Sequence, residues 1–245
     1  MKYVWYKKYW QIGFLSRLYD LLAPEAYVDS LRLGTNHISG EATIFDAGCG
    51  SGLLIPLLRE RLKSGYRYIG TDLLRSGVRS SKRKIEGCRV LVFQSDLLAG
   101  LSLRKESVDV VFAAFLTYTV SDVGKRQVLM RDLCAILKPG GKLILINLSR
   151  NYNAKNIISR SLEIVRKKMG YRHYWIKKCF VYPLTLRLGL NFVASQIDSN
   201  KWHAYTQDEL CAETRAGGFE VTHVESVYAD SAYLVVAEKP GKTKR

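Results

Sequence analysis

Residues 43–52 read TIFDAGCGSG. The short apolar run at the start is followed by an acid and then by three glycines, a pattern typical of a buried strand that turns directly into a helix. Glycines at such a turn let the backbone approach a ligand closely, and the first turn of a helix offers unpaired N–H groups. The stretch therefore predicts a ligand-binding loop between a strand and a helix.

The spacing of the glycines restricts the kind of ligand. In this loop Gly50 is followed two residues later by Gly52, and the position that a G-x-G-x-x-G dinucleotide fingerprint would give to glycine is Leu53. A P-loop is excluded as well, because no G-K-[ST] follows that could supply a lysine to a phosphate. The loop thus predicts neither of the two most familiar nucleotide-binding motifs.

Outward from this loop, short apolar runs alternate with amphipathic stretches, as they do in β-α-β units of a parallel sheet. Strands are expected over residues 43–47, 66–71, 89–94, 108–114, 142–148, 219–227 and 232–237. Helices are expected over residues 51–63, 73–85, 122–137 and 207–216. In the third helix an apolar stripe is formed by Val123, Val128, Leu129, Leu133 and Ile136.

Two connections in this pattern carry topological information. Pro139, Gly140 and Gly141 are expected to stop the third helix and turn the chain into the next strand. The last two strands are joined by a turn at Ala229, Asp230 and Ser231, which is too short for a crossover helix, so these strands must pair antiparallel. The predicted fold class is an α/β three-layer sandwich, with a seven-stranded, mostly parallel sheet that ends in an antiparallel hairpin.

Two further acids follow the second and third expected strands. Asp72 lies at the end of the second strand, where a carboxylate can accept hydrogen bonds from both ribose hydroxyls of a nucleoside. Asp96 and Leu97 come directly after the third strand, where they could bracket an adenine ring. Ligands in such folds bind at the carboxyl ends of the parallel strands, so these residues are expected to lie beside the glycine loop.

Residues 44–52, 71–72, 95–96 and 137–143 resemble, in order, the motifs of class I S-adenosylmethionine-dependent methyltransferases. The resemblance covers residues 43–148, resumes over residues 204–238, and implies a Rossmann-like fold with the seventh strand inserted antiparallel between the fifth and sixth. It also implies S-adenosyl-L-methionine as the cofactor. By the same resemblance, the glycine loop passes the methionine part of the cofactor, Asp72 the ribose, and Asp96 with Leu97 the adenine. The residues expected at the cofactor are Asp46, Gly48, Cys49, Gly50, Gly52, Asp72, Leu73, Asp96, Leu97, Phe115 and Tyr19.

The cofactor motifs do not name the methyl acceptor, because a sulfonium methyl group is already activated and transfer needs mainly a positioned nucleophile. The segment after the fourth strand, residues 113–119, lacks the [DNS]-P-P-[FYW] motif of methyltransferases that act on amino groups of nucleic acids. This segment favours an apolar or aromatic acceptor. Tyr118, His203 and Tyr205 are the predicted catalytic residues, with structural packing as the alternative for each.

More than fifty residues separate the fifth strand from the last helix, far more than a usual connection. Residues 149–203 are predicted to be an insertion that covers the acceptor. Residues 154–169 have Ile158, Leu162, Val165 and Met169 at helical spacing. Residues 184–192 alternate leucine or phenylalanine with other residues and predict a strand or an extended edge.

The first 42 residues are predicted to form a helical lid over the cofactor. Aromatic residues at its start are mixed with lysines, which also suits a lipid headgroup boundary or a surface that stacks on bases. Residues 18–22 resemble the Tyr-Asp segment of ubiquinone and menaquinone C-methyltransferases. Together with the core and the insertion, this lid is expected to form one methyltransferase domain over residues 1–245.

Composition sets the remaining limits. The 245 residues carry a formal net charge of +16 with 47% hydrophobic residues, which excludes a disordered chain and favours anionic partners. No charge-free stretch of about 18 residues and no signal-peptide cleavage site are present, so we expect a cytoplasmic protein, with a peripheral place at an anionic membrane surface as a further prediction. The five cysteines show no metal-ligand spacing, and no metal site is predicted.

Three functions compete on these grounds. The first is S-adenosylmethionine-dependent methyl transfer to a small hydrophobic acceptor that is lipid- or quinone-like and membrane-associated. The second is an RNA methyltransferase, which the basic charge favours and the lack of an RNA-binding motif opposes. The third is a non-catalytic S-adenosylmethionine-binding protein, which the complete set of loop and acidic residues opposes.

Overall fold

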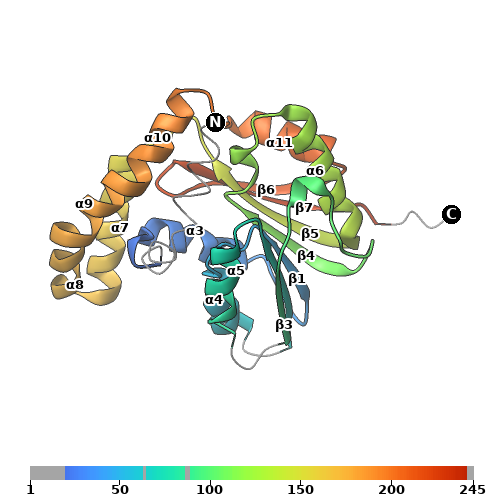
Figure 1. Ribbon diagram of the computed structural model, residues 1–245, viewed down its shortest axis with the longest axis horizontal. Helices are drawn as coiled ribbons and strands as arrows, with labels where there is room; N and C mark the ends of the chain where they lie inside the picture. Colours follow the sequence, from blue (N-terminus) through green and yellow to red (C-terminus); the bar gives the residue numbers. More distant parts are fainter. Residues whose placement is uncertain (1–19, 63–64, 86–88, 242–245) are drawn as a thin grey trace.

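The computed structural model describes residues 20–62, 65–85 and 89–241 of the chain. These residues form one sheet of seven strands in the order β3-β2-β1-β4-β5-β7-β6 (Figure 1). The strands are β1 (Thr43–Ala47), β2 (Arg67–Asp72), β3 (Arg89–Gln94), β4 (Val108–Ala114), β5 (Leu137–Leu148), β6 (Glu220–Val227) and β7 (Ala232–Glu238). The predicted sheet is therefore confirmed in both the number and the sequence positions of its strands.

The mixed character of the sheet is also confirmed. Strands β1 to β5 pair parallel, whereas β7 pairs antiparallel with both β5 and β6. The seventh strand thus lies between the fifth and the sixth. The central strands are covered on both faces, and Ile144, Leu145 and Ile146 have no exposed surface, as expected for an unbroken apolar run in a buried strand.

The observed strand boundaries lie within one residue of the predicted ones except at the start of β5. Strand β5 begins at Leu137, which pairs with Val108, and therefore includes the Pro-Gly-Gly stretch that was expected to precede it. Gly140 and Gly141 exchange backbone hydrogen bonds of 2.9 Å with Lys239, so this stretch is held extended by the chain after β7. The helix before it ends at Ile136, as the Pro-Gly signal predicts.

Helices cover both faces of the sheet. Helices α3 (Glu25–Thr35), α4 (Leu54–Leu62) and α5 (Arg75–Lys82) lie on one face, and α6 (Val123–Ile136) and α11 (Gln207–Ala216) lie on the other (Figure 1). Right-handed crossovers require this separation, because the strand order runs one way from β1 to β3 and the opposite way from β4 to β5. The three-layer architecture is confirmed.

The predicted apolar stripe of α6 is only partly correct. Val123 and Val128 are about half exposed, whereas Arg126 and Met130 are buried with Leu129, Leu133 and Ile136. Arg126 is buried because its guanidinium group makes an ion pair with Glu213 of α11, with Nε 2.9 Å from Oε2. A pattern of apolar residues alone could not place a charged side chain on the inner face of this helix.

The insertion is helical throughout, so the strand expected over residues 184–192 is wrong. It contains α7 (Ala154–Met169), α8 (Tyr171–Ile176), the π-helical segment η3 (Lys177–Val181), α9 (Tyr182–Thr185), a second π-helical segment η4 (Leu186–Leu190) and α10 (Asn191–Asp198). The inward side chains Tyr182, Thr185 and Leu190 are spaced by three to five residues, a spacing that a strand cannot turn to one face.

The insertion packs on α3 at one end of the sheet. Ala26 donates its backbone N–H to Ser161 Oγ of α7 at 3.0 Å, and Lys177 makes an ion pair with Glu25. The α7 helix has the predicted bounds, but Met169, which was expected on its apolar stripe, is exposed. In the part of the chain that the structure describes, no helix combines the length and the apolar character needed to cross a membrane.

Candidate active site

The residues predicted to contact the cofactor come together at one edge of the sheet. Asp46 is near the carboxyl end of β1, Asp72 ends β2, Asp96 follows β3, and Phe115 follows β4. Because these four strands are parallel neighbours, their carboxyl ends meet at that edge. Tyr19 lies outside the described residues.

The glycine loop has the backbone conformation that the sequence predicts. Gly48, Gly50 and Gly52 have φ values of +80°, +52° and +80°, in the left-handed region that favours glycine. A Cβ atom on Gly52 would lie 2.5 Å from Ser81 Oγ, whereas one on Gly50 would have no atom within 4 Å. Gly52 therefore serves close packing against α5, and Gly50 faces open space in which a ligand would meet the backbone.

Asp72 joins the glycine loop to the segment between β2 and α5. Its Oδ2 accepts a hydrogen bond of 2.9 Å from the backbone N–H of Gly50, and its Oδ1 accepts one of 2.7 Å from Leu74. Burial raises the pKa of Asp72, although these two hydrogen bonds oppose the shift. A carboxylate has about four lone-pair positions, so two remain for the ribose hydroxyls of the predicted ligand.

Asp46 is buried beneath the loop rather than exposed to the cleft. Its Oδ2 accepts a hydrogen bond of 2.5 Å from the hydroxyl of Tyr68 on β2. The pKa of Asp46 is raised to about 7, chiefly by burial; the Tyr68 hydrogen bond opposes the rise, and the charge of Asp72 adds to it. Burial also raises the pKa of the neighbouring Cys49 thiol, which is therefore neutral near pH 7. Asp46 is thus buried at the base of the glycine loop, and the side chain of Cys49, a loop residue, is buried as well.

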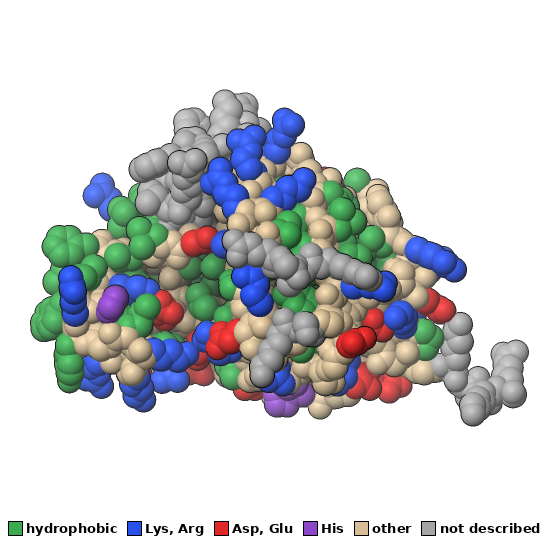
Figure 2. All heavy atoms as spheres, turned by 90° about the horizontal axis from the view of Figure 1, so that it is seen from below, with side chains coloured by type: hydrophobic (Ala, Val, Ile, Leu, Met, Phe, Trp, Pro, Cys, Tyr) green, Lys and Arg blue, Asp and Glu red, His purple; other side chains and the backbone are tan. Residues whose placement is uncertain are grey.

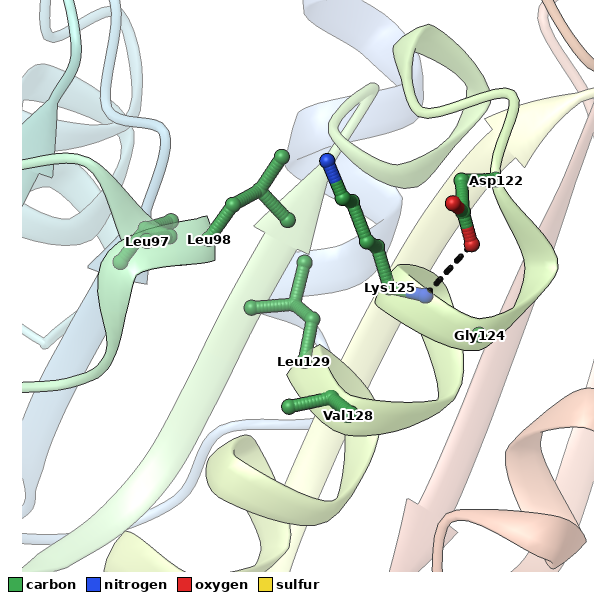
Figure 3. Close-up of a pocket in the computed structure, with 7 residues that line it drawn as sticks. All are labelled: Leu97, Leu98, Asp122, Gly124, Lys125, Val128 and Leu129. Carbon is green, nitrogen blue, oxygen red and sulfur yellow. Dashed lines mark hydrogen bonds between the residues drawn. The ribbon is translucent and has the colours of Figure 1, made fainter.

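Leu97 borders a shallow hollow of ≈ 360 Å³ between the short helix η1 (Leu97–Ala99) and the start of α6 (Figure 3). Asp96 Oδ1 accepts a hydrogen bond of 3.0 Å from the backbone N–H of Leu98 and so caps this helix. Leu98 and Lys125 face the hollow from opposite sides. The apolar lining around Leu97 fits the predicted adenine contact of that residue, whereas the acid that lines the hollow is Asp122 and not Asp96. The adenine contacts of Asp96 and Leu97 stay predictions.

Two aromatic residues that the sequence did not single out lie against Phe115. Its ring centroid is 5.0 Å from that of Tyr27 on α3 and 5.4 Å from that of Tyr228, which follows β6. Phe115, Tyr228, Ala229 and Asp230 all have φ between +52° and +62°, a region that non-glycine residues rarely adopt. Such strain is often held at functional sites, but no sequence signal reveals a left-handed tyrosine.

The three predicted catalytic residues lie close together. The segment before α11 runs along the end of β5, and the backbone N–H of His203 donates to Tyr118 O at 2.8 Å. The rings of His203 and Tyr205 meet edge-on with 4.4 Å between their centroids. His203 Nε2 is 2.8 Å from Glu209 Oε1, although the two groups are not aligned as a hydrogen bond.

Tyr205 is fully buried, and its hydroxyl belongs to a polar chain. Asn147 donates to Thr117 Oγ1 at 2.7 Å, Thr117 Oγ1 is 3.0 Å from the Tyr205 hydroxyl, and that hydroxyl donates to Glu213 Oε1 at 3.0 Å. Burial, with the charge of Glu213, raises the pKa of Tyr205. This placement favours a positioning role for Tyr205, and catalysis by any of the three residues stays a prediction.

The start of the described chain is tied to the glycine loop. Asp20 Oδ1 accepts a hydrogen bond of 2.6 Å from the Ser51 hydroxyl, and Lys84 Nζ lies 2.6 Å from both Asp20 Oδ2 and Ser51 O. Lys84 follows α5, where a lysine would ordinarily extend into solvent. Its actual contacts show that it fastens residue 20 to the loop, next to the residues predicted to form a lid.

Comparison with known proteins agrees with this geometry. Residues 44–141 match the family model of the methyltransferase domain. The chain is 28% identical over 205 residues to a ubiquinone biosynthesis O-methyltransferase of Rhodopseudomonas palustris (strain BisB18), a match that covers 83% of this chain and 72% of that protein. A protein of the same name from Bradyrhizobium sp. (strain ORS 278) is 30% identical over 151 residues, or 60% of this chain and 55% of that protein.

Solved structures share the fold at low sequence identity. A methyltransferase from Haloferax volcanii, solved in complex with the Trm112 methyltransferase activator, has a TM-score of 0.63 and 17% identity, with 96% of this chain and 97% of that chain covered. An S-adenosylmethionine-dependent methyltransferase from Aquifex aeolicus has a TM-score of 0.60 and 17% identity, with 91% and 97% covered.

Fold, loop geometry and relatives together identify the chain as a class I S-adenosylmethionine-dependent methyltransferase, with S-adenosylmethionine as its cofactor. The open space at Gly50 and the unused lone pairs of Asp72 fit that cofactor. Within the class, the curated relatives are O-methyltransferases of ubiquinone biosynthesis, whereas residues 18–22 resemble the C-methyltransferases.

Proposed function

We propose that this methyltransferase acts on a small hydrophobic acceptor, lipid- or quinone-like, which it takes from an anionic membrane surface. The observation that carries the proposal is an exposed aromatic face on the insertion with basic residues among its side chains. A separate series of aromatic rings leads from α10 of the insertion to the segment after β4. The names of the curated relatives support a quinone-like acceptor.

The exposed face lies on α8, η3 and α9. Phe180 is 76% exposed, Tyr171 68% and Trp175 54%, and Ile176 and Leu184 are also exposed. Figure 2 shows hydrophobic side chains gathered at this end of the molecule, with Lys and Arg side chains among them. Contiguous exposed hydrophobic side chains of this size are typical of protein or membrane interaction sites.

The charges of the insertion match an anionic bilayer. Residues 149–205 contain eleven Lys and Arg but only two Asp and Glu. The ammonium group of Lys178 lies 4.9 Å from the Trp175 ring centroid and 5.5 Å from that of Tyr174, so a cation and two amphipathic rings share one surface. Tyr and Trp favour the headgroup level of a membrane, and each basic residue near anionic lipid adds about 1 kcal/mol of attraction.

Aromatic contacts lead from the insertion toward the candidate active site. The ring of Phe192 on α10 is 5.6 Å from that of Trp202, and the ring of Trp202 is 5.1 Å from that of Tyr118 after β4. The apolar tail of an acceptor could contact these aromatic rings on its way to the candidate active site, so that its tail stays in van der Waals contact with apolar side chains. This route supports the role of the insertion as the acceptor cover.

When bound, S-adenosylmethionine supplies a methyl group on a sulfonium centre that is already activated for transfer. The chain has to orient the acceptor, exclude water and remove a proton from an acceptor hydroxyl. His203 is our candidate for accepting this proton, because imidazole is the commonest general base in enzymes and the Glu209 carboxylate, 2.8 Å from its Nε2, restricts where the ring can lie. Cofactor contacts are assigned to the Gly50 backbone and to Asp72.

Label transfer tests the proposal. Protein incubated with S-adenosylmethionine that carries a tritiated methyl group is expected to label a lipid extract and not total RNA. Label in RNA alone would replace this proposal with the RNA methyltransferase alternative. His203→Gln is expected to lower kcat and leave cofactor affinity unchanged.

Vesicle sedimentation tests the membrane part of the proposal. Phe180→Ser is expected to reduce binding to phosphatidylglycerol vesicles, because it removes the most exposed large apolar side chain of the face. Leu91→Ser is the matched control, since Leu91 is 57% exposed on the edge strand β3, far from the insertion. Equal binding by both variants and the wild type would contradict membrane docking through this face.

A further inference from the structure

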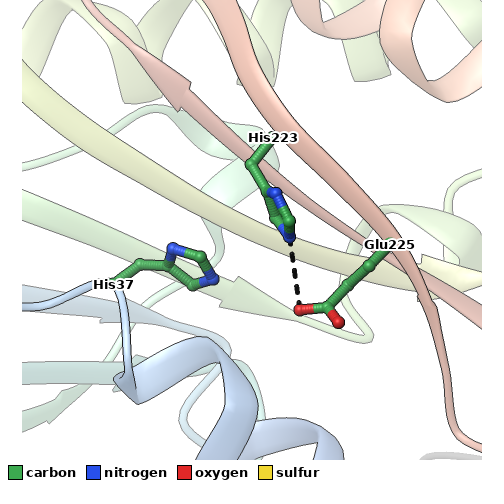
Figure 4. A group of neighbouring side chains, drawn as sticks. All are labelled: His37, His223 and Glu225. Carbon is green, nitrogen blue, oxygen red and sulfur yellow. Dashed lines mark ion pairs between the residues drawn. The ribbon is translucent and has the colours of Figure 1, made fainter.

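His37, His223 and Glu225 form a cluster that the methyltransferase site does not use. His37 lies between α3 and β1, and His223 and Glu225 lie on the edge strand β6 (Figure 4). The two imidazole centroids are 5.0 Å apart, and His223 Nε2 is 3.4 Å from Glu225 Oε1. One ligand atom from each of the three side chains lies within 4.8 Å of the other two.

We propose that this cluster binds one divalent transition-metal ion, with Zn²⁺ as the expected ion. Two imidazoles and one carboxylate are a ligand set that suits Zn²⁺ and its neighbours in the first transition series. Mg²⁺ and Ca²⁺ are disfavoured, because they prefer sites made of oxygen ligands. The sequence predicted no metal site, because His37 is 186 or more residues from the other two ligands and the set matches no motif.

The distances are close to those that a tetrahedral ion requires. Bonds of about 2.0–2.1 Å at tetrahedral angles place neighbouring ligand atoms about 3.3 Å apart. The pair formed by His223 and Glu225 is already at 3.4 Å. His37 has to approach only by a side-chain rotation, since its ring faces that of His223 (Figure 4).

The local backbone presents the ligands to solvent. His223 and Glu225 are two residues apart on one strand and so point to the same face. The pairing of β6 with β7 shifts by one residue between Val221 and His223, a bulge of the kind that redirects a side chain. All three side chains are at least partly exposed, with His223 at 44% and Glu225 at 35%, which gives an ion access and leaves room for water as a fourth ligand.

Two cations near His37 oppose the binding of a dication, and both have other partners. Lys142 lies 3.9 Å from Glu238, and the Arg61 guanidinium donates hydrogen bonds to the carbonyl oxygens of Thr35 and Asn36 at 2.8 and 3.1 Å. The site is also separate from the cofactor cleft, because His37 precedes the amino end of β1 whereas Asp72 lies at the carboxyl end of β2. A bound ion would therefore fasten the segment after α3 to β6 without entering the cleft.

Calorimetric titration with zinc chloride tests the site on the full chain without a histidine tag. The wild type is expected to bind one ion per chain, and His223→Ala to bind it about tenfold or more weakly, since even second-shell changes cost that much. Glu225→Gln preserves the shape of the side chain and is expected to weaken binding as well. His173→Ala is the matched control, because His173 is exposed on the distant α8.

A second measurement separates this site from surface thiols. Cys179→Ser removes an exposed thiol and is expected to retain the ion. Zn²⁺ should raise the melting temperature of the wild type and of Cys179→Ser more than that of His223→Ala. No saturable binding by the wild type, or equal affinity in the wild type, His37→Ala and His223→Ala, would overturn the proposal.

Discussion

Replacing Asp72 by asparagine tests the link between the glycine loop and the cofactor. In the wild type, the two carboxylate oxygens accept separate backbone hydrogen bonds from Gly50 and Leu74. The amide has only one oxygen, so one of these N–H groups must face an NH₂ group. Hydrogen bonds to charged groups contribute about 1.5–3 kcal/mol each. The neutral amide also removes the cost of burying a charge, the same cost that raises the pKa of Asp72. We therefore expect a net loss of about 1–2 kcal/mol in the free energy of unfolding.

Asp72→Asn should also weaken the binding of the cofactor. Two ribose hydroxyls would each exchange a charge-assisted hydrogen bond for a neutral one, at about 1 kcal/mol apiece, which lowers the affinity about 30-fold. Calorimetry with S-adenosylmethionine measures this affinity, and urea denaturation measures stability. Alanine is a poorer choice, because it removes both acceptors and could loosen the loop itself.

Asp109→Asn is the matched control for this experiment. Asp109 Oδ2 also accepts a hydrogen bond from a backbone N–H, that of Thr43 at 2.9 Å, and its Oδ1 accepts one from the side-chain ammonium of Lys138 at 2.7 Å. Asp109, however, lies at the amino ends of β1 and β4. We expect Asp109→Asn to destabilise the fold slightly and to bind the cofactor as the wild type does. If Asp72→Asn bound the cofactor within about twofold of the wild type, the ribose assignment would be refuted and Asp72 would be purely structural.

Three further predictions follow from the same geometry. Gly52→Ala should lower the unfolding free energy by more than about 2 kcal/mol, because the left-handed backbone adds to a collision with α5, whereas Gly50→Ala should cost about 1–2 kcal/mol by urea denaturation yet obstruct cofactor binding in calorimetry. Relative to Asp46→Asn, the wild type should lose up to roughly 4 kcal/mol of unfolding free energy as the pH rises from about 4 to about 7. The cause is the pKa of Asp46, which burial raises from 3.8 to about 7, so that the folded state keeps a proton that the unfolded chain has released. A difference in unfolding free energy between the two proteins that stays constant with pH would contradict this. Glu213→Ala should cost about 3–5 kcal/mol by leaving a buried arginine unpaired, and Tyr205→Phe about 1 kcal/mol; a collapse of kcat in Tyr205→Phe with unchanged stability would instead make Tyr205 catalytic.

The sequence by itself determined the sheet, the glycine loop and the class of cofactor. The sheet and the loop depend on local chemistry: apolar runs of strand length, glycines where φ is positive, and a turn between the last two strands that is too short for a crossover. The cofactor was implied by the resemblance of the ordered motifs to those of class I methyltransferases. Gly48, Gly50 and Gly52 could be assigned from their positions alone, because their role depends on a backbone conformation that other residues rarely adopt. The place of the seventh strand between the fifth and the sixth was implied by the same resemblance, and the structure confirms it.

The tertiary structure decided what depends on partners far apart in the chain. Arg126 is buried only because Glu213 meets it from another helix, and Lys84 is a tether only because Asp20 lies beside the loop. The alternating leucines of residues 184–192 resemble a strand until the packing on α3 and α7 selects a helix. The cluster of His37, His223 and Glu225 brings together a residue near the start of the chain and two residues near its end. Such contacts have no local signal, because each residue type has an acceptable solvent-exposed alternative until the fold brings its partner within reach.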